Sequence, residues 1–146
     1  MKRLLASAAL ALALTTLPAA AADKLTVLLD WFVNPDHATL VVARDKGFFA
    51  AEGLEVELIA PADPSAPPRL VAAGQGDIAV SYQPQLHLAV KEGLPVVRFA
   101  TLVETPLNSV MALDGGAVKT LADLKGKKIG YSVAGFEDAV LAAMLA

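Results

Sequence analysis

The chain has 146 residues, a formal net charge of −3 and no cysteine, and 55% of its residues are apolar. The absence of cysteine excludes disulfides, thiolate metal sites and the N-terminal lipid anchor of a bacterial lipoprotein. The mildly acidic composition, which includes no basic tract, argues against nucleic acid or an anionic membrane surface as a partner.

Residues 1–22 have the pattern of a cleaved secretory signal peptide. Lys2 and Arg3 precede an uncharged, Leu- and Ala-rich stretch over 4–17, and a run of four alanines ends at Ala22. A positive start, an apolar centre and small residues before the cleavage site define such signals. The alternative is a membrane anchor, but this stretch is shorter than the roughly 20 residues that span a bilayer, and Pro18 interrupts its end. The sequence therefore predicts a periplasmic protein.

Strand-like and helix-like patterns alternate after this signal. Apolar runs and period-two alternation predict strands over 24–29, 54–59 and 78–80. Helical spacing predicts helices over 37–46, 70–74 and 84–92. Gly47 is suited to end the first helix and Pro84 to begin the third.

The second half continues the alternation. It predicts strands over 96–102, 109–113 and 129–132, a short capped helix over 120–126 and a last helix from about Phe136. That helix reaches Ala146 without the Gly, Asn, Pro or basic last turn that usually mark a helix end. We expect the chain to be the N-terminal part of a longer protein; a short natural protein with a frayed end is the alternative.

The alternation predicts an α/β fold with a parallel sheet, in which loops at the carboxyl ends of the strands are available to a ligand. The chain has no HExxH or GxSxG motif and no nucleophilic cysteine, which argues against an enzyme. The glycine-containing run over 130–135 lacks the GxGxxG and P-loop patterns, so we expect no nucleotide site. His87 lies among apolar residues with nothing at metal spacing, which favours a structural role; no metal and no cofactor are expected.

Three segments carry a resemblance to a known family. Residues 29–37 read LDWFVNPDH, residues 46–54 contain KGFF and EGL, and residues 124–131 read LKGKKIGY. Together they resemble the group of ABC-importer solute-binding proteins that take thiamine-pyrimidine precursors (hydroxymethylpyrimidine or formylaminopyrimidine), to which fungal pyrimidine synthases are related. The resemblance implies a two-lobed periplasmic-binding-protein fold of type II. Lobe one would occupy 23–113 and be incomplete, and 114–146 would be the start of a truncated lobe two.

Trp31 is the only tryptophan and directly follows the first predicted strand. An indole is a flat platform for a pyrimidine ring, and stacking of a base on an aromatic side chain contributes about 1–3 kcal/mol. A core tryptophan is the alternative. The sequence together with the resemblance favours the ligand platform.

Polar side chains surround this tryptophan. Asp30 and Asn34 could pair with the ring nitrogen and exocyclic amine of an aminopyrimidine, although turn formation at Asn34 and helix capping by Asp36 explain the pattern equally well. His37 opens the next predicted helix, where it would either contact ligand or be solvated.

Further candidates lie at later strand ends and near the crossing between lobes. Tyr82 and Gln83 follow the third predicted strand, and a loop packed under its own helix is the alternative for them. The remaining candidates are Glu104, Thr105, Asn108, Ser132, Gly135, Phe136 and Glu137. Exposed N–H groups at the start of the last helix would favour a polar or anionic ligand group.

The expected function is that of the solute-binding component of an ABC importer, a non-enzyme that binds an aminopyrimidine and docks on an inner-membrane permease. A monomer is expected for the full-length protein. Two alternatives stay open: a pyrimidine synthase on the same fold, and a binding protein for a riboflavin-like ring, a sulfonate or a nitrate-type anion. No arginine lies in the predicted strand-end loops of lobe one, which weakens an anion site.

Overall fold

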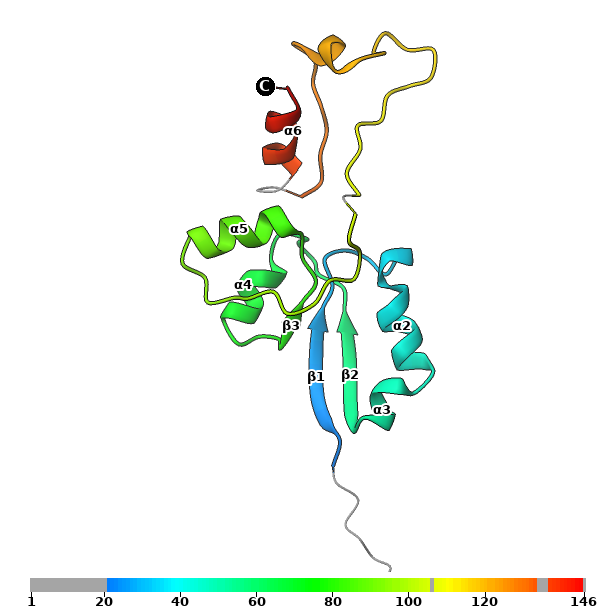
Figure 1. The fold of residues 1–146 in the computed structure, drawn as a ribbon, viewed down its shortest axis with the longest axis vertical. Coiled ribbons are helices and arrows are strands. Elements are labelled where there is room, and N and C mark those ends of the chain that lie inside the picture. Colours follow the sequence, from blue (N-terminus) through cyan, green and yellow to red (C-terminus); the bar gives the residue numbers. More distant parts are fainter. Residues whose placement is uncertain (1–20, 106, 134–136, 146) are drawn as a thin grey trace, which may run out of the picture.

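Three parallel strands form the sheet at the centre of the first part of the chain. The computed structural model describes residues 21–105, 107–133 and 137–145, so nearly all of the predicted signal peptide lies outside the described residues. The strands are β1 (Asp23–Leu28), β2 (Leu54–Ile59) and β3 (Ile78–Ala79), in the order β2-β1-β3. All pairings are parallel, which confirms the predicted α/β character (Figure 1).

The burial patterns of β1 and β2 explain why these residues form strands. In β2, half-buried and exposed residues alternate, as expected for a strand with one face against the core. The central strand β1 instead ends in consecutive buried residues, Val27 and Leu28, and the following Leu29 is completely buried. A strand that is covered on both faces has consecutive apolar residues, which is the pattern at the end of β1.

Helices lie on both sides of the sheet. The 3-10 helix η1 (Pro35–His37), α2 (Ala38–Asp45) and α3 (Phe48–Ala51) lie beside β2, whereas α4 (Pro67–Ala72) and α5 (Gln83–Lys91) lie toward β3 (Figure 1). Gly47 ends α2 in the left-handed conformation (φ +75°), as predicted for a helix-ending glycine. The short helix α3 was not predicted, because four residues are too few to show a helical period.

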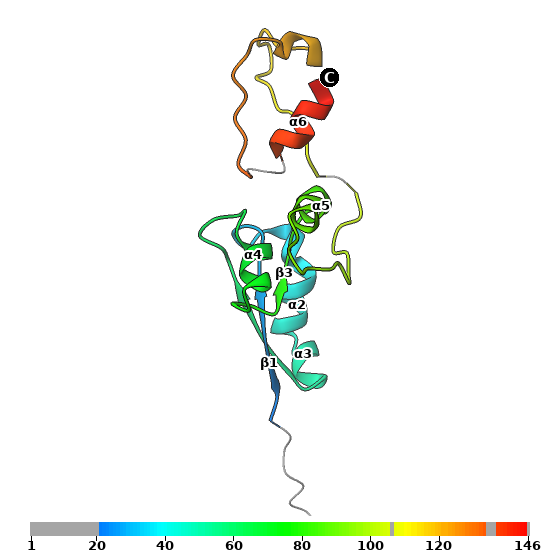
Figure 2. The same ribbon diagram turned by 90° about the vertical axis from the view of Figure 1, so that its left-hand side faces the viewer.

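The remaining described helices lie at the other end of an elongated molecule. They are the 3-10 helix η2 (Leu121–Leu124) and α6 (Glu137–Leu145), and both views show α5 between the sheet and α6 (Figures 1 and 2). Thr120 and Asp123 form a capping box that starts η2, which confirms a capped helix here. Whether residue 114 begins a second lobe stays a prediction.

The predicted strands over 96–102, 109–113 and 129–132 are wrong. These residues are extended but belong to no strand. A β-strand exists through hydrogen bonds to a neighbouring strand, and the described residues include no segment paired with them. Several of their apolar side chains are exposed, among them Val97 at 86% and Met111 at 92%. Across the described residues, no helix has the length and apolarity that a membrane crossing requires.

Candidate functional site

Asp30 is the centre of a hydrogen-bonded cluster at the carboxyl end of the sheet. Its Oδ1 lies 2.7 Å from Nε2 of His37, and its Oδ2 accepts a hydrogen bond of 2.5 Å from the hydroxyl of Tyr82. Asp30 follows β1 and Tyr82 follows β3, which are neighbouring parallel strands. Because the carboxyl ends of such strands share one edge of the sheet, residues 52 positions apart meet there.

His37 is buried inside this cluster, with a side chain that is only 1% exposed. Its Nδ1 accepts a hydrogen bond of 3.3 Å from the backbone N–H of Asn34. Since that backbone group can only donate, Nδ1 carries no proton and Nε2 donates to Asp30. The alternative of a solvated histidine at the helix start is therefore wrong. Both ring nitrogens of His37 are thus occupied by hydrogen-bond partners within the protein.

The turn that carries His37 is built by Asn34. Its Oδ1 accepts a hydrogen bond of 2.8 Å from the backbone N–H of Asp36, and its Nδ2 donates to the backbone oxygen of Phe32. Asn34 is thus the N-cap of η1, which confirms turn chemistry at this residue. The interpretation of Asp36 as the cap is wrong, because the capping side chain is that of Asn34.

Trp31 lies beside the cluster and is only partly buried. Its ring meets that of Phe32 in an edge-to-face arrangement, with centroids 5.7 Å apart and planes at 81°. Phe32 is 67% exposed and was not among the candidates. The sequence signal for it was the adjacent pair of aromatic residues in a loop that follows a buried strand. The pair directly follows Asp30 in the chain, and Phe32 is largely exposed.

Negative charge surrounds Tyr82. Burial is the main cause that raises the pKa of its phenol, followed by the hydrogen bond to Asp30 and the charges of Asp30, Glu137 and Asp36. These causes place Glu137, from the start of α6, within electrostatic reach of the strand-end cluster. Two candidates that are 107 positions apart in the sequence, Asp30 and Glu137, therefore act on one phenol.

Glu137 folds back onto the residues before α6. Its carboxylate accepts hydrogen bonds from the backbone N–H groups of Ser132 (2.5 Å) and Val133 (3.0 Å) and from the Ser132 hydroxyl. Partial burial alone would raise the pKa of this carboxyl, but these hydrogen bonds outweigh it and the pKa is lowered. Glu137 therefore remains ionised and fixes the loop that leads into α6.

The polar side chains at the start of α5 are engaged with one another. The amide of Gln83 contacts His87 at 2.5 Å and accepts a hydrogen bond of 2.7 Å from Arg98. Arg98 thus lies close to a strand-end loop, which the sequence did not indicate because it falls in a segment predicted as a strand. Gln85 is buried and accepts a hydrogen bond from Ser81, and it also was not among the candidates. Gln85 lies four positions before Ala89, the other buried residue of α5, and this helical spacing was the sequence pattern that could have indicated its burial.

The other candidates are more scattered. Glu104, Thr105 and Asn108 are exposed on the segment that leaves the sheet. Asn108 and Glu137 both line a cavity of about 560 Å³ between that segment and α6. Gly135 and Phe136 lie outside the described residues. The ligand roles of all the candidates stay predictions.

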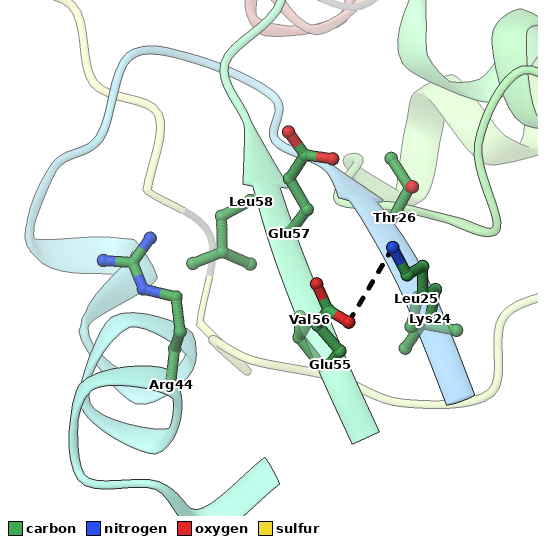
Figure 3. A pocket seen from close by; sticks show the side chains of 8 residues that line it. All are labelled: Lys24, Leu25, Thr26, Arg44, Glu55, Val56, Glu57 and Leu58. Carbon is green, nitrogen blue, oxygen red and sulfur yellow. Dashed lines mark ion pairs between the residues drawn. The ribbon is translucent and has the colours of Figure 1, made fainter. Parts of the chain in front are cut away.

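A second cavity, of about 510 Å³, lies along β1 and β2 beside α2 (Figure 3). It is lined by Lys24, Leu25, Thr26, Arg44, Glu55, Val56, Glu57 and Leu58. Two of its charged groups, Lys24 and Glu55, form an exposed ion pair of 3.9 Å (Figure 3). Ligands of open α/β sheets bind at the carboxyl ends of the strands, so this cavity is not the candidate site. No group of three potential metal ligands occurs among residues 21–105, 107–133 and 137–145.

Three relatives are similar to this chain. A Haemophilus influenzae protein named as a thiamine biosynthesis protein is 59% identical over 130 residues, which cover 89% of this chain and 41% of the relative. A formylaminopyrimidine-binding protein of Halalkalibacterium halodurans is 43% identical over 111 residues, covering 76% of this chain and 34% of that protein. A 4-amino-5-hydroxymethyl-2-methylpyrimidine phosphate synthase of Uromyces fabae is 37% identical over 110 residues, with coverages of 75% and 32%.

The comparisons bear on the family and on the extent of the chain. The chain spans between about a third and two fifths of the length of these three relatives. The family described as NMT1/THI5 like matches residues 34–146, which is well over half of the chain. The predicted relationship to thiamine-pyrimidine binding proteins and fungal pyrimidine synthases is thereby confirmed. The chain belongs to the NMT1/THI5-like family.

Proposed function

We propose that this chain is the N-terminal part of a periplasmic solute-binding protein that captures an aminopyrimidine precursor of thiamine and presents it to an ABC permease. The first 22 residues would direct export, and the mature part would supply one wall of an interlobe cleft. Ligand would favour the closed form of that cleft because it contacts both lobes there.

The observation that carries this proposal is the carboxylate of Asp30 beside Trp31. An aminopyrimidine offers amine donors at its edge and an aromatic face. The carboxylate would accept from the donors, while the indole would stack on the face. Asp30 retains 12% side-chain exposure, so it is accessible from the end of the sheet.

The charge of the site supports an amine-bearing ligand over an anion. Asp30, Asp36 and Glu137 all act on Tyr82. A sulfonate, a nitrate-type ion or a pyrimidine phosphate would be repelled by these carboxylates. The guanidinium of Arg98 donates a hydrogen bond to Gln83. A riboflavin-like ring has no comparable charge conflict and is the competing ligand.

A synthase is the second candidate function, since several relatives of 32–39% identity are named as pyrimidine phosphate synthases. The formylaminopyrimidine-binding relative is similar at 43% identity, which favours the binding role. Cell fractionation separates the two: a periplasmic product shortened by about 22 residues supports the binding protein. A cytosolic product that retains Lys2 and Arg3 would support the synthase.

Calorimetry on the purified full-length protein tests the ligand. We expect binding of 4-amino-5-hydroxymethyl-2-methylpyrimidine, and weaker or no binding of its phosphate, a sulfonate or riboflavin. Trp31→Ala should weaken pyrimidine binding by roughly 5- to 150-fold, because stacking on an aromatic contributes about 1–3 kcal/mol. Trp31→Phe, which keeps an aromatic face, is the matched control and should lose less. Equal affinities for the wild type and Trp31→Ala would remove the stacking role.

A further inference from the structure

His37 is a polar side chain that is completely enclosed yet lies one hydrogen bond from the candidate ligand site. Its exposure is 1%, whereas that of the Asp30 side chain it contacts is 12%. A buried polar side chain persists only where its partners are satisfied. In His37 the turn N–H of Asn34 occupies Nδ1, and Asp30 receives the proton of Nε2.

Two donors determine the orientation of the Asp30 carboxylate. His37 occupies one lone pair of Oδ1, and Tyr82 occupies one lone pair of Oδ2. An ionised carboxylate has about four lone-pair sites, so roughly two remain for a ligand. The donors come from separate elements, the start of the helical segment after β1 and the loop after β3. The carboxylate is therefore held from two sides before any ligand arrives.

We propose that His37 is a positioning residue for ligand binding: its Nε2–H holds the Asp30 carboxylate in the orientation that a ligand amine requires. This inference rests on the proposed function. Such pre-orientation strengthens binding because the ligand does not have to order the acidic side chain itself. Hydrogen bonds to ionised groups are also stronger than neutral ones, which keeps the carboxylate in place.

The protonation state of His37 is part of this arrangement. Asp30 faces its Nε2, Tyr82 faces the same carboxylate, and Asp36 and Glu137 lie near Tyr82. Protonation at Nδ1 would favour contact with these acids but would remove the acceptor that the Asn34 N–H uses. The observed geometry thus selects the neutral tautomer with its proton on Nε2.

Two substitutions separate positioning from simple loss of structure. His37→Leu removes both hydrogen bonds, whereas His37→Gln retains one amide donor and one carbonyl acceptor. We expect His37→Leu to weaken binding of 4-amino-5-hydroxymethyl-2-methylpyrimidine by about tenfold or more, and His37→Gln to recover most of the loss. Val27→Ala is the control: it removes part of a buried side chain of β1 that makes none of the hydrogen bonds to Asp30, and it should lower the melting temperature while leaving affinity unchanged.

A spectroscopic measurement completes the test. In ¹⁵N-histidine spectra of the wild type, the signals absent from His37→Gln belong to His37 and should show a protonated Nε2 and a bare Nδ1. Saturation with the pyrimidine should shift the Nε2 signal, because the ligand polarises the carboxylate that this nitrogen contacts. Equal affinity of His37→Leu and wild type, equal weakness of the Leu and Gln variants, or an unmoved Nε2 signal would overturn the positioning role alone. A wild type that binds no pyrimidine would overturn the proposed function and the positioning role together.

Discussion

The cluster of Asp30, His37 and Tyr82 and the segment over 94–131 differ in the burial and hydrogen bonding of their side chains. In the cluster, Asp30 accepts hydrogen bonds from both His37 and Tyr82, and the preceding Leu29 is fully buried. In the later segment, apolar side chains such as Val97 and Met111 are exposed, and no strand pairing orders the backbone. The hydrogen-bond partners of the first region lie at most 52 positions apart in the chain, whereas the described residues of the second region pair with no strand.

Core truncation should show the largest difference between the two regions. Leu29→Ala removes a completely buried side chain at the base of the cluster and should cost about 2–5 kcal/mol of unfolding free energy. Leu113→Ala, in the extended segment, removes a side chain that is 84% exposed and should change stability by no more than about 0.5 kcal/mol. Urea unfolding followed by circular dichroism measures both. Comparable losses would mean that Leu113 is packed in solution and that the contrast is wrong.

Tyr82→Phe should produce a smaller effect, visible at alkaline pH. Burial first, and then Asp30, raises the pKa of Tyr82 above its ordinary value near 10. Folding therefore favours the protonated phenol, and this contribution is present below the unfolded pKa and is lost as the pH rises through the higher folded pKa. The wild type should lose stability above about pH 10 more steeply than Tyr82→Phe does. Melting temperatures between pH 8 and about pH 11 test this, with the exposed Tyr131→Phe as the control. Parallel pH profiles for the wild type and Tyr82→Phe would contradict it.

The smallest effect is expected at Glu137, at the start of α6. Hydrogen bonds from Ser132 and Val133 outweigh partial burial and lower its pKa below the usual 4.5. The ionised carboxylate therefore stabilises the fold above the unfolded pKa, and this contribution disappears as the pH falls through the folded value. Glu137→Gln should flatten the loss of stability below about pH 4.5. Asp138→Asn is a neighbouring control; an identical change in both variants would assign the effect to net charge.

Much of the first region follows from local sequence patterns. The apolar run before Asp30 and the alternation over 54–59 predict β1 and β2, because periodicity reports burial directly. The rule that parallel strands share a carboxyl edge then places Asp30 and Tyr82 in the same neighbourhood. The cap at Asn34 was likewise visible as turn chemistry.

The parts that could not be predicted depend on long-range contacts. The burial of His37 depends on the positions of both Asp30 and the turn, so the sequence offered ligand contact or solvation and did not indicate the buried hydrogen bonds that the structure shows. The apolar segments over 96–102 and 109–113 have strand composition, but composition does not state whether a partner strand is present. Arg98 approaches Gln83 only because that segment bends back past α5 instead of pairing in a sheet.

The edge-to-face contact between Trp31 and Phe32 gives the molecule a built-in optical reporter. The chain has a single tryptophan, so all of its indole emission originates within two residues of the Asp30 carboxylate. Any aromatic guest that settles on that ring must alter its surroundings, whereas events at the distant end of the strands should leave the emission unchanged. Occupancy of the strand-end site can thus be followed by the intrinsic fluorescence of Trp31, without labelling the protein.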